Sequence, residues 1–206
     1  MALISGWSAA VRAKRRRFVV ALALVVLGAG VGGCNADPPD PGPTRSESAS
    51  ADGTASGSPT AAPGPAVPVL PEAAREASEA GARAFVEYYW ELVNYAQATG
   101  DVKALRQLSA STCDVCLAFV KEIRSLYSQG GRILGGINTS RITEVVDLDL
   151  KSGDYGLRIE QDVSYNAQTI IDSTGKRDVR GEGTDRFTAY LLWTEQRWRL
   201  DVMELR

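Results

Sequence analysis

Apolar residues between positions 71 and 127 recur every three to four residues, which is the period of a helix with one buried face. Pro71 and Glu72 indicate where the first helix starts, because proline suits the first helical position and an acid suits the positive end of the helix dipole. Gly100 is expected to end this helix. Its apolar stripe consists of Ala77, Ala84, Phe85, Tyr88, Tyr89, Leu92, Val93 and Ala96.

The same period predicts two shorter helices. Asp101 is expected to cap the second one, because an aspartate there accepts hydrogen bonds from free backbone N–H groups. The third runs from about Cys113 to Tyr127 and ends in residues 128–131. The apolar positions are Val102, Leu105 and Leu108 in the second helix, and Val115, Leu117, Phe119, Val120, Ile123 and Leu126 in the third.

After residue 136 the period changes to two, which is typical of strands with one buried face. Residues 151–154 (Lys-Ser-Gly-Asp) predict a turn, so two strands should form a hairpin. The expected pairs are Leu150 with Tyr155, Leu148 with Leu157, and Val146 with Ile159. This register gathers the apolar residues, Ile142 and Val163 included, on one face of the hairpin.

A second hairpin is predicted at the C-terminus, with Glu195 and Gln196 as its turn. The expected pairs are Trp193 with Trp198, Leu191 with Leu200, and Ala189 with Val202. A cross-strand tryptophan pair contributes about 0.5–1.5 kcal/mol beyond burial. Between the hairpins, residues 172–183 are polar and contain glycine, which predicts a long exposed loop.

The opposite face of the second hairpin carries Tyr190, Leu192 and Met203. These side chains are more apolar than exposure favours, so this face could join two copies in a homodimer, or lie under the linker or a helix. Helices followed by antiparallel strands predict a single α+β domain over residues 71–206, with three N-terminal helices packed on an antiparallel sheet.

A different pattern opens the chain. Basic residues at 12 and 14–17 precede an apolar run over 18–29, and small residues then lead to Cys34. This order predicts a signal peptide over residues 1–33, cleaved between Gly33 and Cys34. The alternative is an uncleaved membrane anchor, but the run is short against the roughly 20 apolar residues that a bilayer requires.

Residues 31–34 (Val-Gly-Gly-Cys) resemble the lipobox of bacterial lipoproteins, in which the cysteine receives a diacylglycerol and becomes the new N-terminus. The resemblance implies that Cys34 anchors the protein to the extracytoplasmic face of the cell membrane. Residues 14–19 (Lys-Arg-Arg-Arg-Phe-Val) resemble a twin-arginine export motif, although an ordinary positive segment explains them too. Residues 34–70 are rich in Pro, Ser, Gly and Ala, so we expect a disordered tether between anchor and domain.

Composition excludes several functions. Signal cleavage would remove five of the 23 basic residues and no acid, changing the net charge from −2 to −7, which argues against nucleic acid as a partner. The chain has no histidine, which removes Ser-His-Asp and Cys-His catalysis and the commonest ligand of catalytic zinc. It has no glycine-rich phosphate loop either, so we expect no cofactor and no metal.

Two cysteines, Cys113 and Cys116, are three residues apart near a predicted helix start. Outside the cytoplasm they should form a disulfide, which would act as a staple between the second and third helices. A redox-active pair is the alternative, although such a motif usually follows a strand. With only Cys34 as a further cysteine and no histidine, the pair does not predict a zinc site.

Five short motifs carry a resemblance to a family. They are residues 85–89 (Phe-Val-Glu-Tyr-Tyr), 94–96 (Asn-Tyr-Ala), 99–101 (Thr-Gly-Asp), 108–109 (Leu-Ser) and the Cys113–Cys116 spacing. Together they resemble an uncharacterised lipoprotein family of actinobacteria, which is similar to the nuclear transport factor 2-like (SnoaL-like, cone-shaped α+β) fold. The resemblance implies a curved sheet wrapped around the first helix, often with a pocket, and it implies no activity.

Two functions remain as hypotheses. The first is a non-catalytic module that binds an envelope protein or a small ligand. The second is an isomerase or dehydratase that would use Asp162 as a base with Tyr88, Tyr89 or Tyr165 as a proton donor. The predicted strand patterns place Asp147, Asp149, Glu160 and Asp162 on the polar face with Arg158, and such a face is usually only solvated. We therefore expect no catalytic residue.

Overall fold

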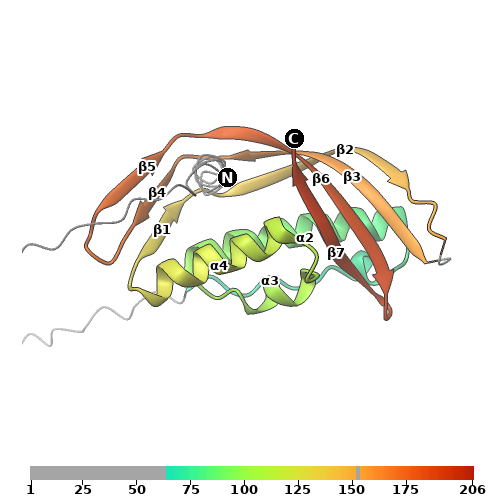
Figure 1. The fold of residues 1–206 in the computed structure, drawn as a ribbon, viewed down its shortest axis with the longest axis horizontal. Helices are drawn as coiled ribbons and strands as arrows, with labels where there is room; N and C mark the ends of the chain where they lie inside the picture. The colour runs from blue at the N-terminus through green and yellow to red at the C-terminus, as the bar shows by residue number, and fades with distance from the viewer. Residues whose placement is uncertain (1–63, 152–153) are drawn as a thin grey trace, which may run out of the picture. The chain divides into compact units, whose positions relative to one another are not determined.

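Three α-helices and one short 3-10 helix precede seven strands in the computed structural model, which describes residues 64–151 and 154–206 (Figure 1). The helices are η1 (Glu72–Arg75), α2 (Glu79–Thr99), α3 (Lys103–Leu108) and α4 (Asp114–Ser128). The strands are β1 (Arg132–Gly135), β2 (Asn138–Asp147), β3 (Tyr155–Tyr165), β4 (Gln168–Ile171), β5 (Arg177–Arg180), β6 (Gly183–Thr194) and β7 (Arg197–Leu205). The predicted signal peptide, Cys34 and most of the predicted tether lie outside the described residues.

Helix α2 starts later than the sequence pattern predicts. Pro71 opens the 3-10 helix η1 instead, and the chain is extended at Glu76 before α2 begins. The hydroxyl of Ser78 caps α2 by accepting a hydrogen bond from the Gly81 N–H at 3.0 Å. The helix ends as predicted at Gly100, whose φ of 79° is left-handed and where a Cβ would lie 2.4 Å from the Tyr127 ring.

The two shorter helices lie within a residue or two of their predicted bounds. Val102 is the N-cap of α3, one residue after the predicted cap Asp101, whose carboxylate accepts a hydrogen bond from the Lys103 N–H at 2.9 Å. Helix α4 has Cys113 at its N-cap, and the Cys113 sulfur accepts a hydrogen bond from the Cys116 N–H at 3.3 Å. The α+β prediction is therefore confirmed for the helical half of the domain.

The strands form a four-stranded antiparallel sheet, β2-β3-β6-β7, and a three-stranded one, β1-β4-β5. Two residues separate β1 from β2, β3 from β4, and β5 from β6, so the small sheet continues three strands of the large one beyond a common bend (Figure 1). At the bend Gly135 and Gly136 have φ of 72° and 74°. A Cβ on Gly136 would lie 2.1 Å from the Gln168 amide nitrogen, so any other residue would have to displace this side chain as well as keep a positive φ.

The β2–β3 hairpin has a different register from the predicted one. Val145, not Val146, pairs with Ile159, and farther along β2 a β-bulge between Ile142 and Glu144 inserts one residue. The insertion reverses the in–out alternation, so Val146 is exposed. Strand β2 also ends at Asp147, three residues before the predicted end of the strand.

The β6–β7 hairpin confirms the predicted turn and two of the predicted pairs, Trp193 with Trp198 and Leu191 with Leu200. The two tryptophan rings are 5.4 Å apart, centroid to centroid. A bulge after Leu200 then shifts the register, so Ala189 pairs with Met203 instead of Val202.

This shift corrects the predicted outer face of the hairpin. Met203 is buried in the core, and Val202 takes its place opposite the half-buried Tyr190. The predicted loop over 172–183 is also wrong, since it contains β5 and the first residue of β6. The loop proper is a tight turn in which the Asp172 carboxylate accepts hydrogen bonds from the Thr174 and Lys176 N–H groups.

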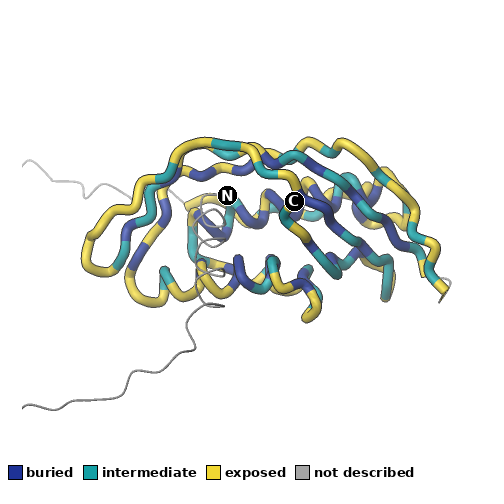
Figure 2. Tube along the Cα trace, turned by 45° about the horizontal axis from the view of Figure 1, so that its top comes forward, coloured by how far each residue is buried: buried dark blue, intermediate teal, exposed yellow. Residues whose placement is uncertain are grey.

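The hydrophobic core lies between α2 and the inner face of the large sheet. Helix α2 buries 11 of its 21 residues, so Trp90, outside the predicted stripe, is buried as well. Its ring lies 5.6 Å from Phe187 on β6 and 6.2 Å from Phe119 on α4, which joins the helices to the sheet. Figure 2 shows buried and half-buried residues along the long strands, and in β3 the two kinds largely alternate, as expected for a sheet with one covered face.

Candidate functional site

A buried polar network lies where α2 crosses the large sheet. The indole N–H of Trp90 donates a 2.8 Å hydrogen bond to Oε1 of Gln161 on β3, and the Ser140 hydroxyl of β2 donates to the same oxygen at 2.6 Å. Gln161 is fully buried, and its Nε2 has no hydrogen-bond partner among the described residues. The network thus holds α2 against β2 and β3, and it leaves the Gln161 Nε2 amide without an acceptor in the interior.

Apolar side chains close the interior around this network. A small space is bounded by Phe85, Val86, Tyr89, Trp90, Gln161, Ala189, Leu191, Leu200 and Met203, and it has no room for a water molecule. No carboxylate lines it. Burial raises the pKa of the Tyr89 hydroxyl well above its ordinary value, with the Ser109 side chain as its polar neighbour, so Tyr89 stays protonated at neutral pH.

The residues of the enzyme hypothesis do not come together. Asp162 lies on the outer face of β3, paired with Arg141 at one carboxylate oxygen and with Arg186 at 3.3 Å at the other. Tyr89 lies on the inner side, in the core. On β3, Tyr165 packs its ring over Gly183, where a Cβ would lie 2.6 Å from the tyrosine hydroxyl oxygen. The sheet therefore separates the Asp162 carboxylate from Tyr89.

Tyr88 is buried on the core side of α2. Burial, followed by the nearby Glu91 carboxylate, raises the pKa of the Tyr88 hydroxyl, so Tyr88 too is neutral at physiological pH. The remaining acids of the predicted polar face form surface ion pairs. Arg158 bridges Glu144 at 3.1 Å and Glu160 at 2.8 Å.

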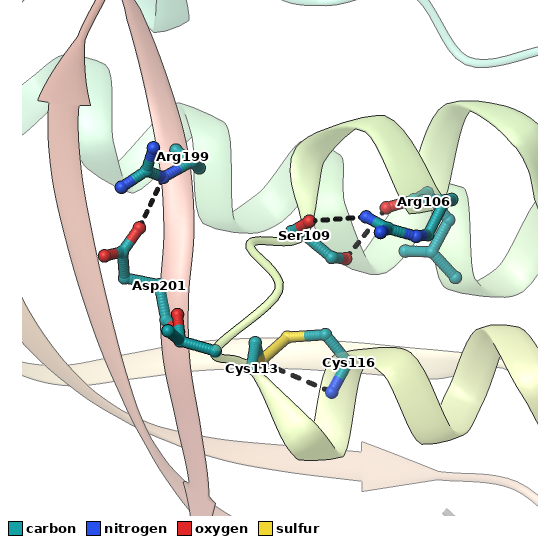
Figure 3. The surroundings of a disulfide bond; sticks show 8 residues. Arg106, Ser109, Cys113, Cys116, Arg199 and Asp201 are labelled. Carbon is teal, nitrogen blue, oxygen red and sulfur yellow. Dashed lines mark hydrogen bonds and ion pairs between the residues drawn. A yellow bond between two sulfur atoms is a disulfide. The ribbon is translucent and has the colours of Figure 1, made fainter.

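The two predicted cysteines form a disulfide, Cys113–Cys116, at the start of α4 (Figure 3). Both residues are fully buried, so no thiol of a redox partner can reach the sulfur atoms without local opening. The loop before Cys113 is attached to β7, with the Ala110 N–H donating to the Leu200 carbonyl at 3.0 Å and the Thr112 hydroxyl to the Asp201 carbonyl at 2.9 Å. The geometry favours a structural staple.

Side chains near the disulfide form local contacts at this corner. The Arg106 guanidinium donates to the Ser109 carbonyl at 2.9 Å, and on β7 Arg199 pairs with Asp201 at 2.5 Å (Figure 3). The carboxylate raises the pKa of Arg199, mainly through this hydrogen bond. The first contact closes the end of α3 and the second lies along β7, so the links between them are the two hydrogen bonds of the loop before Cys113.

A surface hollow of about 300 Å³ lies between α2 and β2, lined by Glu87, Trp90, Glu91, Asn94, Asn138, Thr139 and Ser140. The side-chain amide of Asn94 pairs here with both backbone groups of Asn138, as a residue on a neighbouring strand would. It donates to the Asn138 carbonyl at 2.9 Å and accepts from the Asn138 N–H at 2.8 Å. These amide groups are therefore used in holding the edge of β2. No motif or period in the sequence predicts these contacts.

Within residues 64–151 and 154–206, no group of three or more Cys, Asp or Glu side chains could hold a metal ion. No helix of those same residues is long and apolar enough to cross a bilayer.

Fold and site together define an α+β domain with one long helix under a bent antiparallel sheet, a closed apolar interior and a buried disulfide. The chain belongs to DUF6318, a family of unknown function, whose family model matches residues 51–204. Among curated proteins, no sequence matches this chain.

Several solved structures are similar at low identity. The intermembrane space region of the chloroplast protein ARC6 is 10% identical with a TM-score of 0.42, covering 62% of this chain and 95% of that one. Aln2 from a Streptomyces species is 10% identical with a TM-score of 0.36, over 60% and 90% of the two chains. An uncharacterized protein with a cystatin-like fold from Caulobacter vibrioides is 9% identical with a TM-score of 0.30, over 59% and 84%. None of these likenesses assigns an activity.

Proposed function

We propose that this protein is an exported lipoprotein, cleaved after Gly33 and held by lipid on Cys34 at the extracytoplasmic face of the cell membrane. Its domain acts there by binding an envelope protein or a small ligand, without catalysis. The anchor rests on the order of charged, apolar and small residues before Cys34. The tether over residues 35–70 would let the domain move relative to the membrane while staying close to it.

The observation that supports a binding role is the closed interior beneath the sheet. An Asp–Tyr enzyme needs both groups within hydrogen-bond reach of one substrate atom. Here the space beside Tyr89 has no room for water, and Asp162 lies on the other face of the sheet between two arginines. A partner would then be recognised on the outer surface of the domain.

We also infer that the domain belongs to the cone-shaped, nuclear transport factor 2-like folds. The long helix α2 beneath a bent sheet supports this inference. The fold hosts enzymes and non-enzymes alike, so it leaves the function to be decided by the residues.

Metabolic labelling with an alkyne fatty acid tests the anchor. The wild-type protein is expected to carry the label and to sediment with membranes. Cys34→Ser should lose the label and stay as an unprocessed precursor, whereas Cys113→Ser, with the same chemical change at a buried cysteine, should keep it. Equal labelling of wild type and Cys34→Ser contradicts the proposal.

Crosslinking in intact cells tests binding against catalysis. The anchored protein is expected to give crosslinked adducts of defined mass, which mass spectrometry can identify. Asp162→Asn and Tyr89→Phe should leave these adducts unchanged. Absence of any adduct, together with turnover of a small molecule that both substitutions abolish, would establish the enzyme hypothesis instead.

A further inference from the structure

The small sheet β1-β4-β5 has one face against the helices and one face turned away from them. On the inner face Ile133 is buried, and the Gln168 side chain donates a 2.7 Å hydrogen bond to Gln97 of α2. The strand register places six residues on the opposite face, in two rows across the three strands. They are Arg132, Ile171 and Arg177 in the first row, and Leu134, Thr169 and Val179 in the second, and we call them the arginine–aliphatic face.

This face combines two exposed apolar side chains with two basic ones, around the buried Ile171. Leu134 is 46% exposed and Val179 is 72% exposed, and both lie one row from an arginine. Ile137, which is 50% exposed, follows at the bend. No acidic residue belongs to the face, because Asp178, the acid of β5, lies on the inner side and pairs with Arg180.

The two arginines of this face differ from those on the outer face of the large sheet. On the outer face of the large sheet, Arg141, Arg158 and Arg186 all form ion pairs with carboxylates. Arg132 and Arg177 form no ion pair with any described residue. Their positive charge is therefore available to a partner, although the chain as a whole is mildly acidic.

We propose that the arginine–aliphatic face docks on the membrane surface, with its arginines on anionic phospholipid headgroups. Guanidinium groups bind phosphate through paired hydrogen bonds, and small aliphatic side chains can enter the boundary between headgroups and acyl chains. Leu134 and Val179 are exposed in the row next to Arg132 and Arg177, so both kinds of side chain belong to the same face.

The proposal rests on the proposed lipid anchor, which would keep the domain near a bilayer. A folded domain on a flexible tether meets the surface at high local concentration, so a weak patch is sufficient for docking. Docking through the small sheet would orient the domain, leaving the outer face of the large sheet toward other envelope proteins.

Vesicle sedimentation tests the proposal with a chain that starts at Asn35, which contains every described helix and strand and lacks the lipid. Vesicles of phosphatidylglycerol mixed with phosphatidylcholine are expected to bind it, and vesicles of phosphatidylcholine alone to bind it far less. Arg132→Glu with Arg177→Glu should weaken binding by more than about 30-fold, since the loss of each basic residue near an anionic surface removes about a factor of five and each new carboxylate adds repulsion. The matched control reverses two exposed basic residues of α4, Lys121→Glu with Arg124→Glu, and should weaken binding several-fold less.

A second measurement reports insertion directly. A polarity-sensitive dye on Val179→Cys is expected to shift its emission to the blue on vesicle binding, and the same dye on Val146→Cys, exposed on β2, is not. The proposal is overturned by any of three results: no vesicle binding, equal binding to neutral vesicles, or equal losses in the two charge-reversal variants. Because this chain carries no lipid, such a failure leaves the fatty-acid labelling of Cys34 as a separate test of the anchor.

Discussion

At the scale of single residues, the domain depends on a few buried polar side chains. Gln161 serves two donors from different elements, Trp90 on α2 and Ser140 on β2. Its position could have been found in the sequence, because it lies two residues from both Ile159 and Val163, at an inward position of an alternating strand. The role of Trp90 could not have been found in the sequence, because Trp90 lies outside the predicted apolar stripe. Its burial becomes visible only in the structure, where α2 is covered over more than that stripe.

Replacing Gln161 with leucine should destabilise the domain by about 2 kcal/mol, because the buried Trp90 N–H loses its acceptor. Chemical denaturation followed by tryptophan fluorescence measures the change. Ser140→Ala is the control and should lose less than about 1 kcal/mol, since it removes one donor and leaves the Trp90 bond intact. If both variants unfold like the wild type, the network does not stabilise the fold.

Asp185 predicts a pH dependence of stability. Burial raises the pKa of its carboxyl, whose Oδ2 has no hydrogen-bond partner among the described residues. The folded state thus holds this proton more tightly than the unfolded chain, whose pKa is near 3.8. This group therefore lowers the free energy of unfolding as the pH rises from the unfolded pKa through the raised folded one.

Asp185→Asn should remove this pH-dependent loss of stability, because asparagine does not titrate. Urea denaturation is expected to show the variant more stable than wild type at neutral pH, with the difference shrinking as the pH falls and absent below the unfolded pKa. A constant difference at every pH would mean that Asp185 acts through its shape and not through its proton.

At the scale of elements, periodicity located the helices well, because residues such as Asp101 and Gly100 mark their ends. The register was predicted correctly only beside the turn of the β6–β7 hairpin, and in the β2–β3 hairpin it is one residue off from the turn onward. Each hairpin contains a β-bulge, and one inserted residue reverses which side chains face inward, as at Val146 and Met203. The strands of the small sheet were missed because four residues are too few to establish a period.

The bend between the sheets gives a prediction about glycine. Gly136→Ala should lose about 2–3 kcal/mol of stability, because alanine there must keep a positive φ and also displace the Gln168 side chain. Gly130→Ala is a matched control, with φ of 83° and open space around its Cβ, and should lose about 1 kcal/mol. Thermal denaturation compares the two, and equal losses would show that the bend tolerates a side chain.

The disulfide gives a second prediction at this scale. Replacing both cysteines, Cys113→Ser with Cys116→Ser, should lower stability by about 2 kcal/mol, the chain-entropy value for so short a loop. The native protein should also resist thiol alkylation without reductant. A mass increase from alkylation under native conditions would contradict the staple and favour a redox role.

At the scale of the whole molecule, sequence composition predicts a signal peptide and a tether, most of which lie outside the described residues. The buried core of the described domain lies between Ala74 and Met203. We expect residues 64–206 to fold without the preceding segment. Their melting temperature should lie within about 1 °C of that of residues 35–206, because a polar tether adds no core. A lower value by calorimetry would show that residues 35–63 pack on the domain.

The shared bend has a consequence for how this chain can change over time. Three neighbouring strands are each interrupted by two residues at one level, so their lengths on either side are coupled. An insertion or deletion in one of them would displace its partners' pairing throughout the smaller sheet. Viable length variants should therefore be confined to the hairpin tips, or arise as matched changes in all three strands.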